Sequence, residues 1–231
     1  MSNQKNTNSP QEAKKVDRAE WMAAQGCQFR HFLSFEIRAG EVGAEGADAG
    51  ALYVEGIATP FNTPTVLLSI DGVDYKEQID ARAFEGADMS DVIFNYNHGG
   101  KVVARTRNNT LTLWVEADGL HMRARLDGTD EGRKLYEEIK GGYIDRMSFA
   151  FRIAESSYNI ETHTRTVLRV KKVYDVSAVD IPAYDTTSIS ARNSFAVEIE
   201  REKSAAVAAS LRKEVLQDEI NLTIKLYGGK Q

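Results

Sequence analysis

The chain has 231 residues, of which 42% are apolar and 27% charged, and its net charge is −5 at pH 7. This composition suits a globular protein of one domain with extensions, or of two small domains, and the acidic balance argues against a nucleic-acid partner held by phosphate contacts. No apolar run reaches the roughly 18 residues of a membrane-spanning helix, so we expect no membrane partner either.

The N-terminal residues are polar and mostly aperiodic, so we interpret residues 1–28 as a flexible arm. They lack the apolar stretch of a secretory signal. The single cysteine, Cys27, lies at the edge of this arm and excludes an internal disulfide, which fits a reducing compartment.

Strand patterns follow in the first half of the chain. The stretch CQFRHFLSFEIRAG (27–40) has apolar residues at alternating positions, and VIFNYNH (92–98) is a short strand-like run that ends at a glycine pair. Between them, the Gly- and Ala-rich segment 41–51 predicts a loop, and Asp71-Gly72 predicts a hairpin turn.

The second half carries clearer signals. The stretch TLTLWVEADGLHMRARLD (110–127) predicts a hairpin joined at Asp118-Gly119, and GTDEGRKLYEEIKGG (128–142) predicts a short helix. The alternation in YIDRMSFAFRI (143–153) predicts a strand, and a long strand follows over residues 167–181.

These elements predict a mainly β (α+β) fold, an antiparallel β-barrel with peripheral helices. We assign residues 29–193 to the barrel domain. Residues 194–231 begin with an Ala-, Glu- and Lys-rich stretch, and we assign them to a C-terminal helical segment.

Metal and phosphate chemistry find no support in the motifs. The four histidines, His31, His98, His121 and His163, show no HxH or HxxxH spacing, and cysteine pairs are absent. Glycine-rich phosphate loops of the GxxxxGK[ST] or GxGxxG type are absent too. We therefore expect neither a metal nor a cofactor.

A nucleophile needs a base and a group that orients the base. His98 is the best placed histidine, because it ends an apolar strand beside two glycines, where a side chain is well held and can still face a cleft. The other three lie on an apolar strand face, on a solvated strand face and in a polar loop. A solvent-facing turn residue is the alternative for His98.

Ser148 lies on the side of its strand opposite Met147, Phe149 and Phe151. It can be a nucleophile, although a serine on that side of a strand can also be an ordinary polar residue.

Asp175 stands in the long strand, on the face opposite Leu168, Val170, Tyr174 and Val176, where an unpaired acid costs free energy. If the two strands pair antiparallel, Ser148 and Asp175 fall near one another, and His98 can bridge them. A surface acid near two lysines is the alternative for Asp175.

The order of motifs carries a resemblance to a known family. EGIATPFN, ARAF, FNYNHGGKVVART, LTLWVEADGLHMRARL, GGYIDRMSFAFRI and VYDVSAVDIPAY follow one another as in the prohead maturation proteases of tailed bacteriophages. The resemblance spans residues 52–192 and is strongest at Asn97-His98, at Met-Ser-Phe-x-Phe (147–151) and at [DE]-Val-Ser-x-Val-x-x-Pro-Ala (175–183). This family is related in fold to the herpesvirus assemblins, serine proteases built on a β-barrel surrounded by helices.

The resemblance implies a serine endopeptidase whose catalytic residues are His98, Ser148 and an acid. The family usually has glutamate where Asp175 stands, and the shorter aspartate needs a small backbone adjustment or a water to reach the histidine. Arg192 is an oxyanion candidate, by analogy with assemblins, where an arginine-bearing loop has this role; a solvated arginine before a helix is the alternative.

The resemblance also implies a biological role. Such proteases cleave the scaffolding segment of the major capsid protein precursor, or a separate scaffold protein, and often themselves, inside the prohead in the cytoplasm of the bacterial host. The gene would then belong to a phage or a prophage. Assemblins act as dimers, which makes a homodimer a further expectation. The alternative is a non-catalytic capsid-assembly or scaffold-binding module on the same fold.

Overall fold

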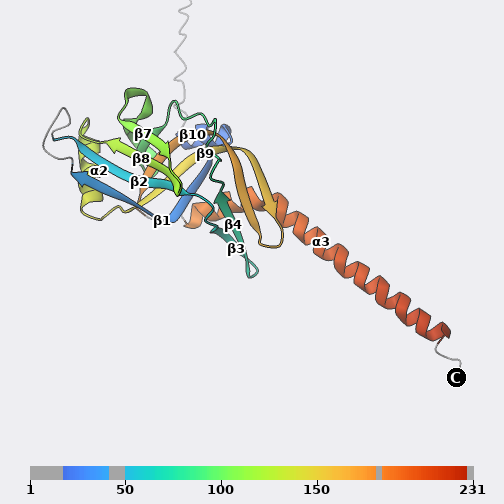
Figure 1. Cartoon of the computed structure of the whole chain (residues 1–231). Helices are drawn as coiled ribbons and strands as arrows, with labels where there is room; N and C mark the ends of the chain where they lie inside the picture. The colour runs from blue at the N-terminus through green and yellow to red at the C-terminus, as the bar shows by residue number, and fades with distance from the viewer. Residues whose placement is uncertain (1–17, 42–49, 181–183, 228–231) are drawn as a thin grey trace, which may run out of the picture.

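The computed structural model describes residues 18–41, 50–180 and 184–227, and Figure 1 shows their arrangement. The first elements are α1 (Arg18–Ala24), β1 (Gln28–Glu41), β2 (Leu52–Pro60), β3 (Thr65–Ile70), β4 (Val73–Ile79), β5 (Ile93–Tyr96) and β6 (Gly99–Arg105). The 3-10 helix η1 (Thr106–Asn108), β7 (Leu111–Val115), β8 (Gly119–Arg125), α2 (Asp130–Lys140), β9 (Arg146–Asn159), β10 (Thr164–Val179) and α3 (Tyr184–Tyr227) follow. The predicted hairpin at 110–127 and the predicted helix at 128–142 are therefore confirmed.

The strands form one sheet in the order β3-β4-β10-β9-β1-β2-β8-β7, with β5 and β6 branching from β10. β10 organises this sheet. One of its edges pairs antiparallel with β9, and the other pairs with β4 at residues 164–167 and with β5 at residues 175–178. The last two pairings are parallel, so the sheet is mixed, while the other strand pairings are antiparallel, in line with the mainly antiparallel arrangement that the sequence predicts.

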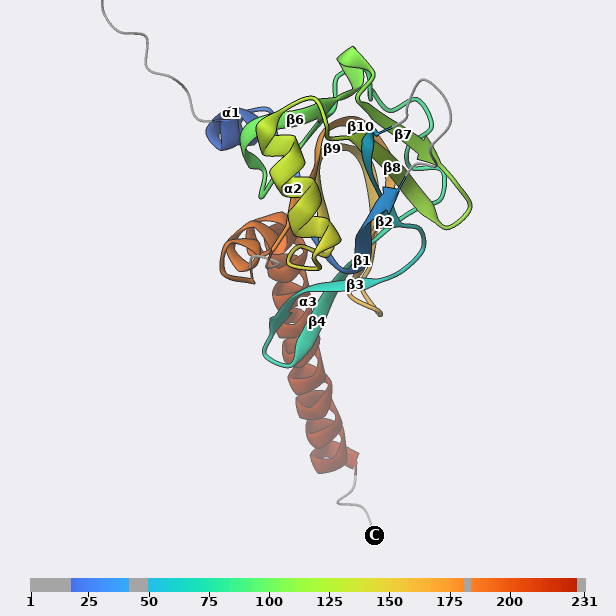
Figure 2. The same cartoon turned by 90° about the vertical axis from the view of Figure 1, so that its left-hand side faces the viewer.

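The predicted closed barrel is not formed. Within residues 18–41, 50–180 and 184–227, no strand pairing joins β7 to β3 or to β6. Closure needs the two end strands to meet edge to edge, but the second edge of β10 is shared by two short strands, so the sheet branches and stays open. Figure 2 shows β3 and β7 apart from one another. The fold is mostly β with helices at its periphery.

One face of the sheet carries the main core. Met147, Phe149 and Phe151 of β9 are fully buried in it, as their alternation predicts, and the two phenylalanine rings stack with centroids 4.3 Å apart. α2 covers part of this core with its apolar side. The helix begins where Thr129 accepts a hydrogen bond from the backbone N–H of Gly132 at 2.9 Å, a side-chain cap of the usual kind.

The other face of the sheet has a smaller apolar cluster, formed by Met22 of α1 together with Ile93, Ala150 and Tyr174. This helix lies inside the segment that we interpreted as a flexible arm. The remaining residues of that arm, 1–17, lie outside the described residues, as do most of the predicted loop (42–49) and residues 181–183. Because the main core covers one face of the sheet and the cluster around Met22 covers the other, both faces of β9 are buried around Ser148.

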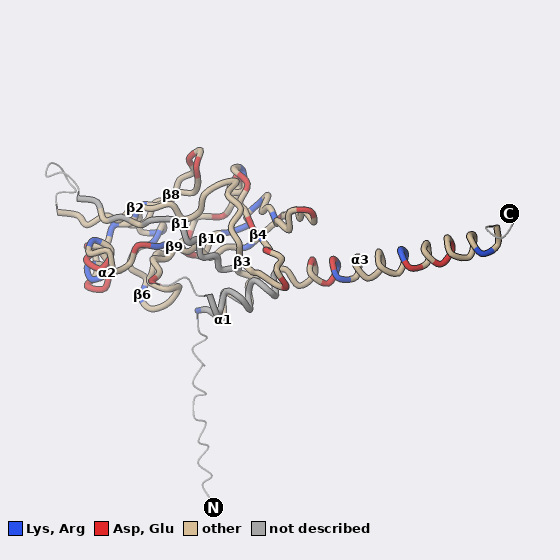
Figure 3. Tube along the Cα trace, turned by 90° about the horizontal axis from the view of Figure 1, so that it is seen from below, with Lys and Arg blue, Asp and Glu red and all other residues tan. Residues whose placement is uncertain are grey.

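α3 contacts the body only through its first part. Phe195 and Ile199 pack with Leu68 and Tyr75 of the β3–β4 hairpin. From residue 203 to residue 227 every residue is exposed, and the helix projects from the body with charges of both signs along it (Figures 1 and 3). No helix in the described parts of the chain is long and apolar enough to cross a membrane.

Candidate active site

His98 stands in the tight turn that joins β5 to β6. Tyr96 pairs with Gly99, so Asn97 and His98 form the turn, with φ of 50° and 56°. Positive φ at both central positions defines a type I′ hairpin turn, which favours Asn-Gly. A histidine in the second position costs roughly 1–2 kcal/mol of backbone strain relative to glycine. Strain of this kind persists where the surrounding contacts enforce it, and it concentrates at functional sites.

The contacts that enforce the turn come from the end of β10. The backbone N–H of Asn97 donates to the carbonyl of Ala178 at 3.0 Å. The Asn97 amide donates to one carboxylate oxygen of Asp180 at 3.0 Å, and the Tyr96 hydroxyl donates to the other at 2.5 Å. Because His98 follows directly, this clamp fixes the backbone that carries the imidazole.

The register of β9 against β10 places the other two candidates. Ser148 lies opposite Ser177, and Asp175 lies opposite Ala150, so Ser148 and Asp175 are diagonal neighbours across the strand pair. The antiparallel pairing and the proximity that we expected are therefore confirmed.

A β-bulge decides the direction of Asp175. The register shifts between Val173 and Asp175, which inserts Tyr174 as an extra residue. Val173 and Val176 both enter the main core, whereas Tyr174 packs with Ala150 on the other face. Our assignment of Tyr174 to the core face was therefore wrong, because simple alternation does not account for a bulge.

His98 connects Ser148 to Asp175 in one hydrogen-bonded line. Its Nε2 lies 2.6 Å from Ser148 Oγ, and its Nδ1 lies 2.7 Å from Asp175 Oδ1. Ser148 and Asp175 are fully buried, and the imidazole is only 11% exposed. A proton on Nδ1 satisfies both contacts, because Nδ1–H then donates to the carboxylate and Nε2 accepts from the serine hydroxyl.

Two further buried polar residues, Ser177 and Asn95, adjoin this line, and the sequence analysis did not single them out. Ser177 Oγ lies 3.1 Å from Asp175 Oδ1, 3.2 Å from His98 Nδ1 and 2.7 Å from Asn95 Oδ1. A signal for Ser177 existed in the sequence, because residues two apart on a strand share a face. No comparable local signal marks Asn95, which reaches the site through the parallel pairing of β5 with β10.

His121 and His163 take no part in this line. The backbone of His31 pairs with Ser148 across β1 and β9, while His163 contacts Glu202 of α3 at 3.0 Å. The side chain of His31 lies outside the described residues. So does the side chain of Arg192, our oxyanion candidate, which belongs to α3.

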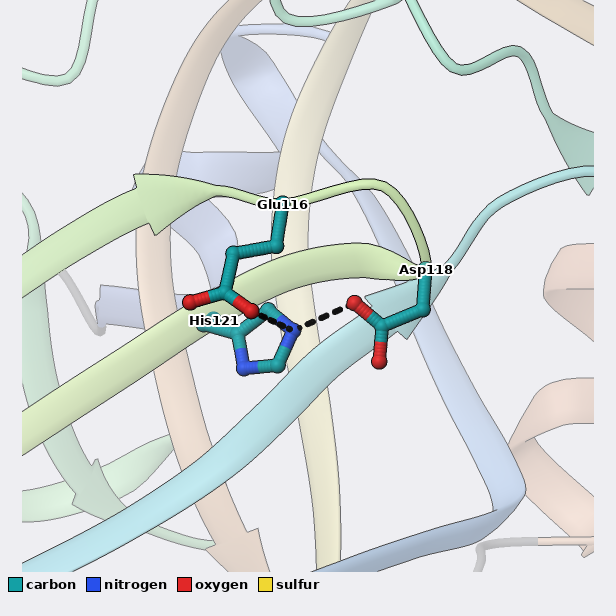
Figure 4. Close-up of side chains that lie close together, drawn as sticks. All are labelled: Glu116, Asp118 and His121. Carbon is teal, nitrogen blue, oxygen red and sulfur yellow. Dashed lines mark hydrogen bonds and ion pairs between the residues drawn. The ribbon is translucent and has the colours of Figure 1, made fainter.

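His121 lies in the β7–β8 hairpin with two carboxylates (Figure 4). Its Nε2 is 2.7 Å from Asp118 and 3.8 Å from Glu116, and the ring stacks on Trp114. The three residues have the donor types of a metal site, yet the carboxylate side chains are 54% and 62% exposed, and an exposed ion pair explains the contacts equally well. The expectation of a metal-free protein stays a prediction.

The chain is similar to known proteins in sequence and in structure. The family model of the caudovirus prohead serine protease matches residues 35–201. A search of curated proteins gives no significant match. Among solved structures, the bacteriophage T4 capsid assembly protease, gp21, is similar at a TM-score of 0.41 and 17% identity, over 68% of this chain and 98% of that chain. The family match covers most of the chain, including the whole hydrogen-bonded line, and the protein therefore belongs to the caudovirus prohead serine protease family.

Proposed function

We propose that this protein is a serine endopeptidase that acts through Ser148, His98 and Asp175. The observation that carries the proposal is the continuous line of hydrogen bonds from the serine hydroxyl, through the imidazole, to the buried carboxylate. Nucleophile, base and orienting acid are recognised by this geometry and by their roles, whatever their order in the chain.

Each residue has a defined part in acyl transfer. Ser148 Oγ attacks the scissile carbonyl while His98 Nε2 takes the hydroxyl proton, and the protonated imidazole then gives that proton to the leaving amine. Water attacks the acyl-enzyme in the same way, with His98 again as base. Asp175 holds the proton on Nδ1 and stabilises the imidazolium. The tetrahedral oxyanion needs donors of its own, for which Arg192 is our candidate.

Aspartate can do here what glutamate usually does in the family. The sequence raised the question of reach, because aspartate is one methylene shorter. The direct 2.7 Å contact between Asp175 and His98 supports the substitution, because the shorter side chain reaches the imidazole without a bridging water.

The substrate and setting follow from family membership as part of the proposal. We expect cleavage of the scaffolding segment of the major capsid protein precursor, or of a separate scaffold protein, and of the protein itself, inside the prohead in the host cytoplasm. An assemblin-like relationship, a homodimer and a division into arm (1–28), protease domain (29–193) and C-terminal segment (194–231) belong to the same proposal.

A non-catalytic assembly module is the second candidate. Its support is the complete burial of Ser148, since a nucleophile must meet its substrate and this one is covered. A catalytic protein therefore has to open at this site, whereas an assembly module does not.

A fluorophosphonate probe separates the two candidates, because it phosphonylates only serines that a base has activated. We expect covalent labelling at Ser148, found by mass spectrometry, and its loss in Ser148→Ala and His98→Ala. Ser156→Ala is the matched control, as Ser156 lies exposed on the same strand, β9, and should leave labelling unchanged. No labelling of the wild-type chain, together with uncleaved capsid precursor on co-expression, would favour the assembly module.

A further inference from the structure

We propose that Ser177, held in place by Asn95, positions the acid of the triad and is needed for full reactivity of Ser148. This inference rests on the proposed function, because it assigns a role to a residue of the same site. Ser177 touches no substrate in this account, so it is a positioning residue that acts through Asp175 and His98.

The argument begins with the partners of the carboxylate. Oδ1 of Asp175 receives the His98 contact at 2.7 Å and the Ser177 hydroxyl at 3.1 Å. The other oxygen, Oδ2, is buried and has no hydrogen-bond partner within the described residues. The carboxylate is therefore oriented by contacts at one oxygen alone. Without the Ser177 hydroxyl, only the His98 imidazole would hold the carboxylate among the described residues, although the carboxylate is the group that should orient the imidazole.

The second step concerns the position of Ser177 in the sheet. It lies opposite Ser148 on β9 and opposite Asn95 on β5, so three polar residues form a row across three neighbouring strands. Asn95 belongs to the hairpin that carries His98, and Ser177 belongs to the strand that carries Asp175. The 2.7 Å bond between Ser177 and Asn95 thus ties the base-bearing hairpin to the acid-bearing strand.

The third step is chemical. Ser177 Oγ also lies 3.2 Å from His98 Nδ1, so it sits beside the proton that Nδ1 donates to the carboxylate. The hydroxyl of Ser177 has one proton, and both Asn95 Oδ1 and Asp175 Oδ1 are acceptors within its reach. Turning the Asn95 amide brings its NH2 group, which otherwise has no hydrogen-bond partner within the described residues, to Ser177 Oγ as a donor, and the hydroxyl proton is then left for the carboxylate. The three neighbours match the one donor and two acceptor positions of a serine hydroxyl.

The test compares two variants of equal shape, Ser177→Thr and Ser177→Val, which differ in the hydroxyl. Reactivity of Ser148 is measured as the maximal inactivation rate and the half-saturating concentration of a fluorophosphonate. We expect Val to lower the maximal rate about ten- to a hundredfold, the range for losing a hydrogen bond to a charged group, and Thr to retain most of it. The half-saturating concentration should not change, because Ser177 does not touch the probe.

A spectroscopic readout makes the test independent of protease activity. In the Ser148→Ala background, the Nδ1 proton of His98 should give a low-field NMR resonance, owing to its short bond to Asp175. We expect Ser177→Val to shift or broaden that resonance and Ser177→Thr to preserve it. Thr166→Val is the matched control: Thr166 lies on the same strand, and its hydroxyl bonds Gln78 far from the site.

Failure of the positioning role of Ser177 and failure of the proposed function give different results in this test. Equal rates and unchanged resonances in Val and Thr variants would overturn the positioning role, as would loss of folding stability without loss of labelling rate. If both variants fail to fold, Ser177→Ala replaces Val and Ser177→Cys replaces Thr under the same criteria. Full labelling in Ser148→Ala would instead defeat the proposed function, while the resonance would still decide whether Ser177 orients Asp175.

Discussion

The acid at position 175 is the residue on which the proposed triad depends most, because its carboxylate is buried and faces the imidazole directly. In Asp175→Asn the side-chain shape is kept, but the amide can present N–H to Nδ1 and so favour the wrong tautomer. We expect labelling of Ser148 to slow roughly 10⁴-fold, the fall in kcat known for this change in a serine protease triad. The thermal unfolding midpoint serves as control. A rate within tenfold of wild type would assign the orienting role elsewhere.

Asn97 permits a separate test of the strained turn. Its φ is 50°, and its amide donates to Asp180. Asn97→Gly removes the hydrogen bond to Asp180, but glycine adopts a positive φ without strain. Asn97→Ala removes the same hydrogen bond, and alanine is strained at a positive φ. We expect the free energy of unfolding in urea to be lower for Ala than for Gly by about 1 kcal/mol. Equal values for the two variants would show that the turn relaxes and that the strain is not retained.

Sequence reasoning identified the residues of the proposed triad but not the residues around them. The strand-end position of His98 and the pairing that brings Ser148 near Asp175 could be predicted from local pattern and motif order. Asn95 was missed because its contact with Ser177 depends on a parallel pairing between strands far apart in the chain, whereas Ser177 could have been found from its place two residues beyond Asp175 on the same strand. The bulge at Tyr174 was missed because alternation predicts which face a residue occupies only along a regular strand.

Among the elements, the hairpins and α2 could be predicted from the sequence. The pairing of β10 with β9 along one edge and with both β4 and β5 along the other could not be predicted in full. The pairings of β10 with β4 and with β5 join segments separated by long stretches of chain and leave no local signal. They also explain why the predicted barrel was wrong: a strand that serves two partners on one edge creates a branch.

The docking of α3 on the strands should depend on pH through Glu202. Its carboxylate accepts from Tyr158 at 2.5 Å, from His163 at 3.0 Å and from Tyr75 at 2.9 Å. Burial alone would raise the pKa of Glu202, but the hydrogen bonds outweigh it and hold the pKa below its ordinary value of 4.5. A lowered carboxyl pKa means that the stabilisation is present above pH 4.5 and is lost as pH falls through the folded value.

At alkaline pH the docking of α3 should be lost for a second reason, because the pKa of Tyr75 is raised and not lowered. Burial, with the Glu202 hydrogen bond, raises the pKa of Tyr75 from 10.0 to about 12. The stabilisation from the hydrogen bond between the Tyr75 hydroxyl and Glu202 is therefore fully present below pH 10.0 and is lost as pH rises towards 12. Near-ultraviolet circular dichroism of the tyrosines measures both limits. We expect Glu202→Gln to abolish the acid transition, while Glu214→Gln, on the exposed part of α3, should leave it intact. An acid transition that survives in Glu202→Gln would contradict this assignment.

For the molecule as a whole, the burial pattern divides α3 at residue 203. Phe195 is fully buried, Ile199 is 6% exposed, and Glu202 bonds three side chains of the body, whereas residues 203–227 are exposed throughout. The body should therefore keep its stability without the distal part of the helix. Of the described residues, a chain that ends at residue 202 removes only exposed ones, and we expect its free energy of unfolding to fall within about 0.5 kcal/mol of the full chain.

A chain that ends at residue 194 is the matched comparison. It removes Phe195, Ile199 and Glu202 as well, so the apolar cluster with Leu68 and Tyr75 loses its helix side. Truncating one buried phenylalanine alone costs about 3–5 kcal/mol, so the shorter chain should be destabilised by at least this much. Urea unfolding of the three chains, with fluorophosphonate labelling of Ser148 as a second readout, makes the comparison. If the chain ending at residue 202 unfolded as easily as the shorter one, the distal helix would have to contribute to the fold in spite of its exposure. If it kept both stability and labelling, the distal helix would be needed neither for folding nor for the reactivity of Ser148.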